Sequence, residues 1–204
     1  MNREDRPVRN LVFYGDSNTY GYDPADFYEN RYPACRRWTT IVSEALQDSF
    51  RVFEEGMNGR TIPDITRSRG YLARLIEKVK DDGILCTILG TNDILAVMHP
   101  DASTAVRKME QYILFLLQYL RPEQILIIAP PPSGKEDSAD PFWRAAFSES
   151  LKMNRGFRLL AAEYGAHFAD AAEWDISLSY DLVHFSEAGH QIFAREMISL
   201  IRTL

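Results

Sequence analysis

The chain has 204 residues, of which 46% are hydrophobic and 25% are charged, which is globular composition and excludes a disordered chain or a fibrous repeat. Its formal net charge of −6 argues against a nucleic acid or an anionic membrane as partner, and two cysteines are too few for a disulfide scaffold or a zinc site. The charged first residues lack the apolar core of a signal peptide, and no apolar stretch approaches the length of about 20 residues that spans a membrane. We therefore expect a cytoplasmic protein.

Short apolar runs alternate along the chain with longer segments of helical periodicity. The apolar runs predict strands at 11–14, 51–53, 84–89, 125–129 and 167–169. The periodic segments predict helices at 38–47, 71–80, 103–120, 142–164 and 187–202. Pro122 ends the third of these helices, and Ser186 is the candidate N-cap of the last one.

This repeated alternation of strand and helix predicts an α/β fold. Parallel strands need a right-handed crossover that carries a helix, so we expect a parallel sheet with helices on both faces. No internal repeat or change of composition divides the chain, and we expect a single domain over residues 1–204. The stretch 130–141, rich in Pro, Ser, Gly and charge, is expected to be a surface loop.

Polar residues follow four of the predicted strands, at the ends where an open parallel sheet binds its ligands. They occupy 15–19, 56–60, 90–93 and the stretch 181–184 that follows the fifth strand. Because the carboxyl ends of parallel strands share one edge of the sheet, these four segments are expected to converge on one rim.

The rim contains the groups that acyl transfer requires. A serine hydroxyl becomes a nucleophile when a histidine takes its proton, and a carboxylate on the far ring nitrogen stabilises the imidazolium. Ser17, His184 and Asp181 are the candidates for these roles. The oxyanion of the tetrahedral intermediate needs fixed donors, and the backbone N–H groups of Ser17 and Gly59 and the side-chain amide of Asn92 are the candidates.

These segments resemble the four ordered sequence blocks of the SGNH (GDSL-type) hydrolase superfamily. The blocks are Gly15-Asp16-Ser17, Gly59, Gly90-Thr91-Asn92-Asp93 and Asp181-x-x-His184. The resemblance runs from about residue 11 to the C-terminus. It implies that Ser17 is the nucleophile, that Asp181 and His184 complete the triad, and that Ser17, Gly59 and Asn92 form the oxyanion hole. It also implies a flavodoxin-like three-layer α/β/α sandwich, with a five-stranded parallel sheet in the order 2-1-3-4-5.

Two further segments resemble a narrower branch of this superfamily. They are the stretch 54–61 and the proline turn at 130–132. The branch contains small bacterial arylesterases, acyltransferases and xylo-oligosaccharide acetylesterases. Relatives in it commonly assemble as oligomers, so the resemblance implies a possible homo-oligomer.

The same residues have other interpretations. Ser17 alone is typical of a helix N-cap, and Asp93 is expected to fix a loop rather than to act as a base. Asp181, His184, Glu187 and His190 invite a metal site, but a helix that begins near Ser186 turns His190 away, so we expect no metal and no cofactor. A flavodoxin-like binding module without chemistry is a further alternative, although the sequence supplies no phosphate-binding loop.

The candidate substrate-binding residues are Asp16, Tyr22, Trp38 and Trp143. Aromatic rings line grooves for aryl esters and stack on sugars, whereas Asp16 is also expected to hold the nucleophile turn through backbone N–H groups. The segment 21–37 is too short for a deep acyl tunnel. The expected substrate is therefore a small-molecule ester with a short acyl group such as acetyl. A carbohydrate O-deacetylase and an acyl thioesterase on the same triad are the alternatives.

Overall fold

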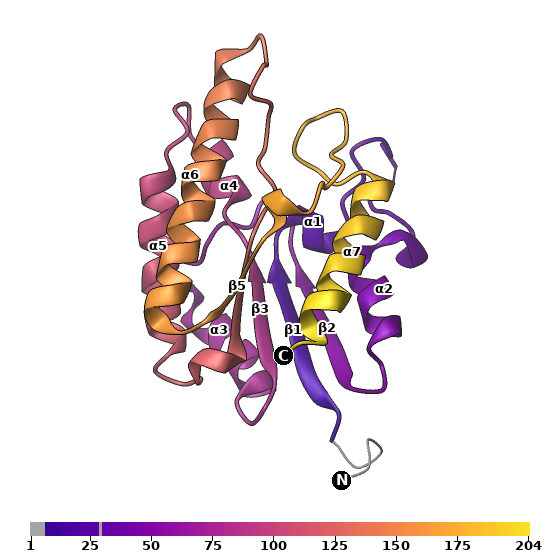
Figure 1. Cartoon of the computed structure of the whole chain (residues 1–204), viewed down its shortest axis with the longest axis vertical. Coiled ribbons are helices and arrows are strands. Elements are labelled where there is room, and N and C mark those ends of the chain that lie inside the picture. Colours follow the sequence, from indigo (N-terminus) through magenta and orange to yellow (C-terminus); the bar gives the residue numbers. More distant parts are fainter. Residues whose placement is uncertain (1–6, 29) are drawn as a thin grey trace.

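A computed structural model describes residues 7–28 and 30–204, and its centre is one five-stranded parallel sheet (Figure 1). The strands are β1 (Arg9–Gly15), β2 (Phe50–Gly56), β3 (Ile84–Ile88), β4 (Ile125–Ala129) and β5 (His167–Asp170). Their spatial order is β2-β1-β3-β4-β5, and all four neighbouring pairs run parallel. The predicted fold class and strand order are thus confirmed.

Helices cover both faces of the sheet. They are α1 (Ser17–Tyr20), α2 (Trp38–Ala45), α3 (Ile65–Val79), α4 (Thr91–Leu95), α5 (Ala102–Leu116), α6 (Pro141–Tyr164) and α7 (Glu187–Ile201). Single 3₁₀ turns are η2 (Ala34–Arg36), η3 (Pro122–Gln124) and η4 (Ala171–Glu173). One core lies between the sheet and α3, α5 and α6, and a second lies between the sheet and α2 and α7. Among the described helices, none is long and apolar enough to cross a membrane.

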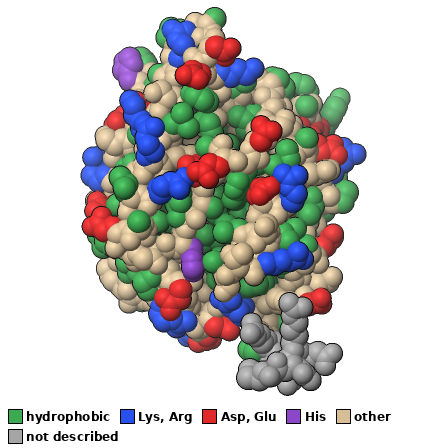
Figure 2. Space-filling view, viewed as in Figure 1, with side chains coloured by type: hydrophobic (Ala, Val, Ile, Leu, Met, Phe, Trp, Pro, Cys, Tyr) green, Lys and Arg blue, Asp and Glu red, His purple; other side chains and the backbone are tan. Residues whose placement is uncertain are grey.

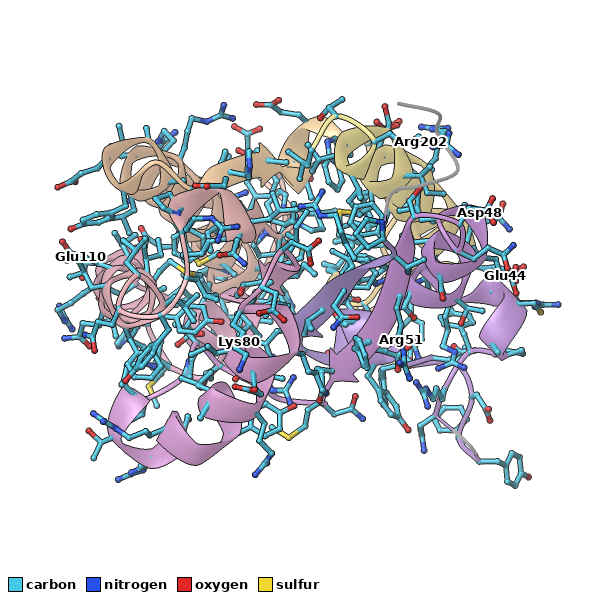
Figure 3. All side chains as sticks on the ribbon, turned by 90° about the horizontal axis from the view of Figure 1, so that it is seen from below. Glu44, Asp48, Arg51, Lys80, Glu110 and Arg202 are labelled. Atoms are coloured by element: carbon cyan, nitrogen blue, oxygen red, sulfur yellow. The ribbon has the colours of Figure 1, made fainter. Side chains whose placement is uncertain are left out.

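The alternation of side chains along β1 explains why two cores form. Leu11 and Phe13 pack on the side of α2 and α7, whereas Val12 and Tyr14 pack on the side of α3 and α5. A strand buried on both faces reads as a continuous apolar run, which is why β1, β3 and β4 were predictable from the sequence. Seen from below, the sheet lies between the two helical layers, with Glu110 at the edge of one layer and Arg202 in the other (Figure 3).

The boundaries of several elements differ from the predictions. Helix α3 begins at Ile65, because the carboxylate of Asp64 accepts hydrogen bonds from the N–H groups of Thr66 and Arg67. The first turns of α3 are largely exposed, so they lack the apolar spacing that marked its second half. The periodicity also missed the short helices α1 and α4, which follow directly after strands.

A glycine in α3 generates a test of stability. Gly70 is exposed within the helix, and a Cβ placed there would meet no atom within 4 Å. We expect Gly70→Ala to raise the free energy of unfolding by about 1 kcal/mol, because alanine loses less backbone entropy in a helix. Denaturant-induced unfolding followed by circular dichroism measures the change.

The matched control is Gly156→Ala in α6, where the added Cβ would lie 2.4 Å from Val106 Cγ2 on α5. There the helix propensity gained is opposed by overpacking between α5 and α6. A Gly156→Ala protein stabilised as much as the Gly70→Ala protein would contradict the packing of these two helices.

Candidate active site

The turn after β1 places Ser17 at the carboxyl end of the sheet (Figure 1). Gly15 ends the strand, and a Cβ on it would lie 2.0 Å from Thr19 Oγ1, so this position needs glycine. Asp16 is the N-cap of α1, and its carboxylate accepts a hydrogen bond of 3.0 Å from the N–H of Asn18. Ser17, the first residue of α1, is 7% exposed.

Asp181 and His184 lie in the segment between η4 and α7, and they face Ser17. His184 Nδ1 lies 2.6 Å from Asp181 Oδ2, and His184 Nε2 lies 3.0 Å from Ser17 Oγ. Leu182 between them has a positive φ of 63°, and this tight turn brings the aspartate back onto the imidazole. The structure therefore brings together the three residues that the sequence singled out as a triad.

The hydrogen bonds of Asp181 decide its charge state. Partial burial acts to raise the pKa of Asp181, but the bonds from the His184 side chain and from the backbone N–H groups of His184 and Val183 outweigh it, and the pKa is lowered. A carboxylate accepts hydrogen bonds only, so Nδ1 of His184 carries the proton between them. When the ring is neutral, Nε2 is the acceptor that faces the Ser17 hydroxyl.

Gly59 and Asn92 lie on the loop after β2 and on helix α4. Gly59 has a φ of +73°, and nothing lies within 4 Å of where a Cβ would stand, so the backbone angle rather than space requires glycine there. Asn92 Nδ2 donates to the Arg60 carbonyl oxygen at 3.0 Å. This bond orients the amide and leaves its second N–H for another acceptor.

Two buried charged residues hold the loop that carries Gly59. Arg60 is 8% exposed, donates to the carbonyl oxygens of Gly15 and Glu55, and stands over the ring of Tyr14. Asp93 accepts from the N–H of Ile62 at 2.8 Å and from Lys108 Nζ at 2.7 Å. The expected loop-fixing role of Asp93 is confirmed. Sequence reasoning missed Arg60, because an arginine in a polar loop gives no sign that its guanidinium is buried.

Trp38 corrects one prediction for the substrate-binding residues. It is 1% exposed, and its ring packs against Phe13 and Phe193 at centroid distances of 4.6 and 4.8 Å. Its indole Nε1 donates to the Asn18 carbonyl oxygen at 2.9 Å. Trp38 lies on the inner face of α2, so it belongs to the core, and a substrate does not reach it.

Asp16 is also buried, at 2% exposure, so its structural role is the one the geometry supports and the prediction of a substrate contact is wrong. Burial raises the pKa of Asp16 to about 7, against the opposing effects of its bond from Asn18 and the charge of Arg60. Tyr22 is partly buried, with its ring centroid 4.5 Å from that of His184. Trp143 packs at the edge of the core of α3, α5 and α6, and its contact with substrate stays a prediction.

His190 is fully buried and does not join His184 in a site. Its Nδ1 accepts from the Trp38 N–H at 3.4 Å. Burial is the main cause that lowers its pKa to about 3, and the charges of Arg37 and His184 add to it. Within residues 7–28 and 30–204, no group of three or more His, Cys, Asp or Glu is placed to hold a metal ion.

A nucleophilic serine, a histidine and an aspartate linked in this order form the arrangement that serine hydrolases use. The model of the GDSL-like lipase/acylhydrolase family matches residues 13–192. The chain belongs to this family, the SGNH hydrolases of the sequence resemblance, and it is a carboxylic ester hydrolase.

Solved structures share the whole fold. An aryl esterase from M. smegmatis is 25% identical with a TM-score of 0.78, and the match covers 97% of this chain and 100% of that one. A carbohydrate acetylesterase from Sinorhizobium meliloti is 24% identical with a TM-score of 0.78, covering 96% and 99%. An acetylxylan esterase from Geobacillus stearothermophilus is 22% identical with a TM-score of 0.69, covering 95% and 94%. No curated protein matches the chain by sequence.

The position of Trp38 leads to a test. We expect Trp38→Phe to lower the free energy of unfolding by about 1 to 2 kcal/mol, because it removes a buried hydrogen bond and part of a buried ring. The KM for an ester substrate stays unchanged, because the side chain lies inside the core. Urea unfolding and steady-state kinetics measure the two quantities, and a changed KM at unchanged stability would contradict the burial of the ring.

The burial of neutral His190 predicts that the free energy of unfolding falls at acid pH. Its pKa is 6.5 when unperturbed and about 3 in the folded protein, so between these values the unfolded chain binds one more proton than the folded one. The contribution of His190 to the free energy of unfolding is present above its pKa in the unfolded chain. It is lost as the pH falls toward its pKa in the folded protein. We expect His190→Leu to reduce the slope of the free energy of unfolding against pH. Between about pH 4 and pH 6 the reduction is about 1.4 kcal/mol per pH unit. Equal slopes in both proteins would refute the assignment.

Proposed function

We propose that this chain is a serine esterase that hydrolyses short-chain, acetyl-type carboxylic esters through an acyl-enzyme on Ser17. The observation that carries the proposal is the continuous line of contacts from Ser17 Oγ through both ring nitrogens of His184 to Asp181, at 3.0 and 2.6 Å. Near neutral pH this line lets the imidazole accept the proton of the hydroxyl while the carboxylate stabilises the charge that forms.

The proposed reaction proceeds in two matched halves. Ser17 Oγ attacks the ester carbonyl carbon while its proton moves to His184 Nε2, and the carbonyl oxygen takes the negative charge. The N–H groups of Ser17 and Gly59 and the amide of Asn92 stabilise that oxyanion. His184 then gives its proton to the departing alcohol oxygen. A water molecule, deprotonated by His184, attacks the acyl-enzyme, and the acid leaves as Ser17 recovers its proton.

The length of the segment after the nucleophile turn supports a short acyl group. The segment 21–37 is short, and the Tyr32 N–H donates to the Gly21 carbonyl oxygen across it. Two surface grooves of the described chain lie away from Ser17. One is lined by Ile41 and Arg195 between α2 and α7, and the other by Val106 and Lys152 between α5 and α6. The proposed site is therefore located by the linked side chains of Ser17, His184 and Asp181 and not by a groove.

A carbohydrate O-deacetylase on the same triad is the second candidate, and the aromatic side chains beside His184 favour it. His184 must reach the leaving oxygen, so the alcohol part of the substrate lies on its side of Ser17. Tyr22 packs on His184, and Tyr180, beside Asp181, is 71% exposed with its hydroxyl bonded to the Pro24 carbonyl oxygen. Such rings stack on a sugar or an aryl group alike. No observation favours the acyl thioesterase.

The surface agrees with an uncharged, small-molecule substrate. Acidic and basic side chains are interspersed over the face shown in Figure 2 rather than gathered by sign. The net charge of −6 adds no attraction for a polyanion. A homo-oligomer and a cytoplasmic location stay predictions.

Replacing the nucleophile tests the mechanism. We expect Ser17→Ala to lower the turnover of p-nitrophenyl acetate at least about 1,000-fold, because no hydroxyl remains to form the acyl-enzyme. Wild-type protein treated with the same ester gains the mass of one acetyl group, located on the peptide that contains Ser17. The exposed serine at the start of α5 supplies the matched control, Ser103→Ala, whose turnover stays at the wild-type rate.

Substrate comparison separates the alternatives. The wild type is assayed with p-nitrophenyl acetate, its octanoate homologue, an acetylated xylo-oligosaccharide and an acetyl thioester. Preference for the acetate over the octanoate supports the short-chain proposal, and the fastest turnover on the acetylated sugar would favour the deacetylase. Equal slow turnover by wild type and Ser17→Ala would overturn the esterase mechanism and favour a non-catalytic binding module.

A further inference from the structure

We infer that Asn18 is a positioning residue that sets the distance between Ser17 and His184, and the inference rests on the function proposed for those two residues. The Asn18 side chain makes two hydrogen bonds to the backbone, one on each side of His184, and we call this pair of bonds the clasp. Its Oδ1 accepts from the Phe185 N–H at 2.8 Å, and its Nδ2 donates to the Val183 carbonyl oxygen at 3.2 Å. One side chain beside the nucleophile thus holds the two peptide groups that flank the histidine.

The clasp is rigid at its nucleophile end. Asn18 is 4% exposed, so its amide is shielded from water. Its backbone N–H donates to the Asp16 carboxylate at 3.0 Å, and its carbonyl oxygen accepts from the Trp38 indole at 2.9 Å. The backbone and the side chain of Asn18 are therefore both fixed, and Ser17 is its direct neighbour. A displacement of the histidine segment relative to Ser17 would break these buried hydrogen bonds.

The two contacts of the triad differ in what they depend on. The contact between Asp181 and His184 is local, because the turn at Leu182 and two bonds to the Asp181 carboxylate form it within one segment. The contact between Ser17 and His184 joins segments 167 positions apart. Among the described residues, the side chain of Asn18 makes the hydrogen bonds between residues 15–19 and 181–186 other than that of Ser17 itself. Asn18 is thus placed to control the second contact and not the first.

The chemistry of the clasp requires an amide. The Val183 carbonyl group and the Phe185 N–H both face the Asn18 side chain. The edge opposite the clasp is occupied, since the His184 carbonyl oxygen accepts from the Ser179 N–H at 2.7 Å. An asparagine side chain supplies one donor and one acceptor to the free edge. An aspartate keeps only the acceptor, and a leucine supplies neither.

The test compares Asn18→Ala, Asn18→Leu and Asn18→Asp with wild type in the acylation burst with p-nitrophenyl acetate. We expect Asn18→Ala and Asn18→Leu to acylate about 100-fold more slowly, because a small displacement of reacting groups has an effect of this size. Loss should fall on the acylation rate, with the dissociation constant of the ester, taken from the concentration dependence of the burst rate, unchanged. Asn18→Asp keeps the bond from Phe185 and should lose less activity, and it keeps the test valid if the alanine variant folds poorly.

A second measurement separates positioning from general support of the fold. The proton between His184 Nδ1 and Asp181 gives a downfield signal in proton NMR, and we expect Asn18→Ala to retain it. In a His184→Ala background, Asn18→Ala should cause no further loss of activity, because its effect passes through the histidine. The control is Asn10→Ala, which removes an amide bond to the Lys78 carbonyl oxygen at the opposite end of β1 and should leave acylation unchanged.

The outcomes are distinct. Wild-type acylation rates in folded Asn18→Ala and Asn18→Leu would overturn the inference. Loss of the downfield signal together with activity would also overturn it, because that result would show that the whole histidine segment had lost its structure. A wild type that forms no acyl adduct on Ser17 would instead overturn the proposed function, and the inference with it.

Discussion

The constraint on which the structure depends is the contact between two chain segments 167 positions apart, Ser17 and His184. A parallel sheet solves this problem because every strand ends at the same edge. The turn after β1 and the segment after β5 therefore reach one rim, although β1 lies in the interior of the sheet and β5 at its border. The covered faces of the sheet make β1 a rigid support for the serine, since its apolar residues pack in both cores.

Polar groups buried behind the rim fix the positions of the loops that form the proposed site. Arg60 ties the loop that carries Gly59 to the ends of β1 and β2, and Asp93 ties the same loop to α4 and α5. Buried charges are tolerated when hydrogen bonds satisfy them, and they then define one geometry strongly. Asn18 extends this network to the histidine segment. The rim thus rests on the buried hydrogen bonds of Arg60, Asp93 and Asn18.

The surroundings of the proposed site are asymmetric. Tyr22 packs on His184, which protonates the departing alcohol in the proposed reaction, and Tyr180 precedes Asp181 in the chain and bonds to the Pro24 carbonyl oxygen. The proposed oxyanion donors lie on other segments, with Gly59 on the loop after β2, which also exposes Met57, and Asn92 on α4. The proposed contacts to the alcohol and the proposed donors to the oxyanion therefore lie on different segments of the chain.

Sequence by itself predicted the strands of the sheet, and it singled out Ser17, Asp181, His184, Gly59 and Asn92 as candidate site residues. The strands follow from apolar runs, and the candidate residues follow from the residue types that the chemistry needs and from the resemblance to the SGNH hydrolases. Only the tertiary structure decided that Trp38 lies in the core, that Arg60 is buried, that His190 is neutral and that Asn18 clasps the segment of His184. The burial and the partners of a side chain depend on residues far away in the chain, and no local pattern records them.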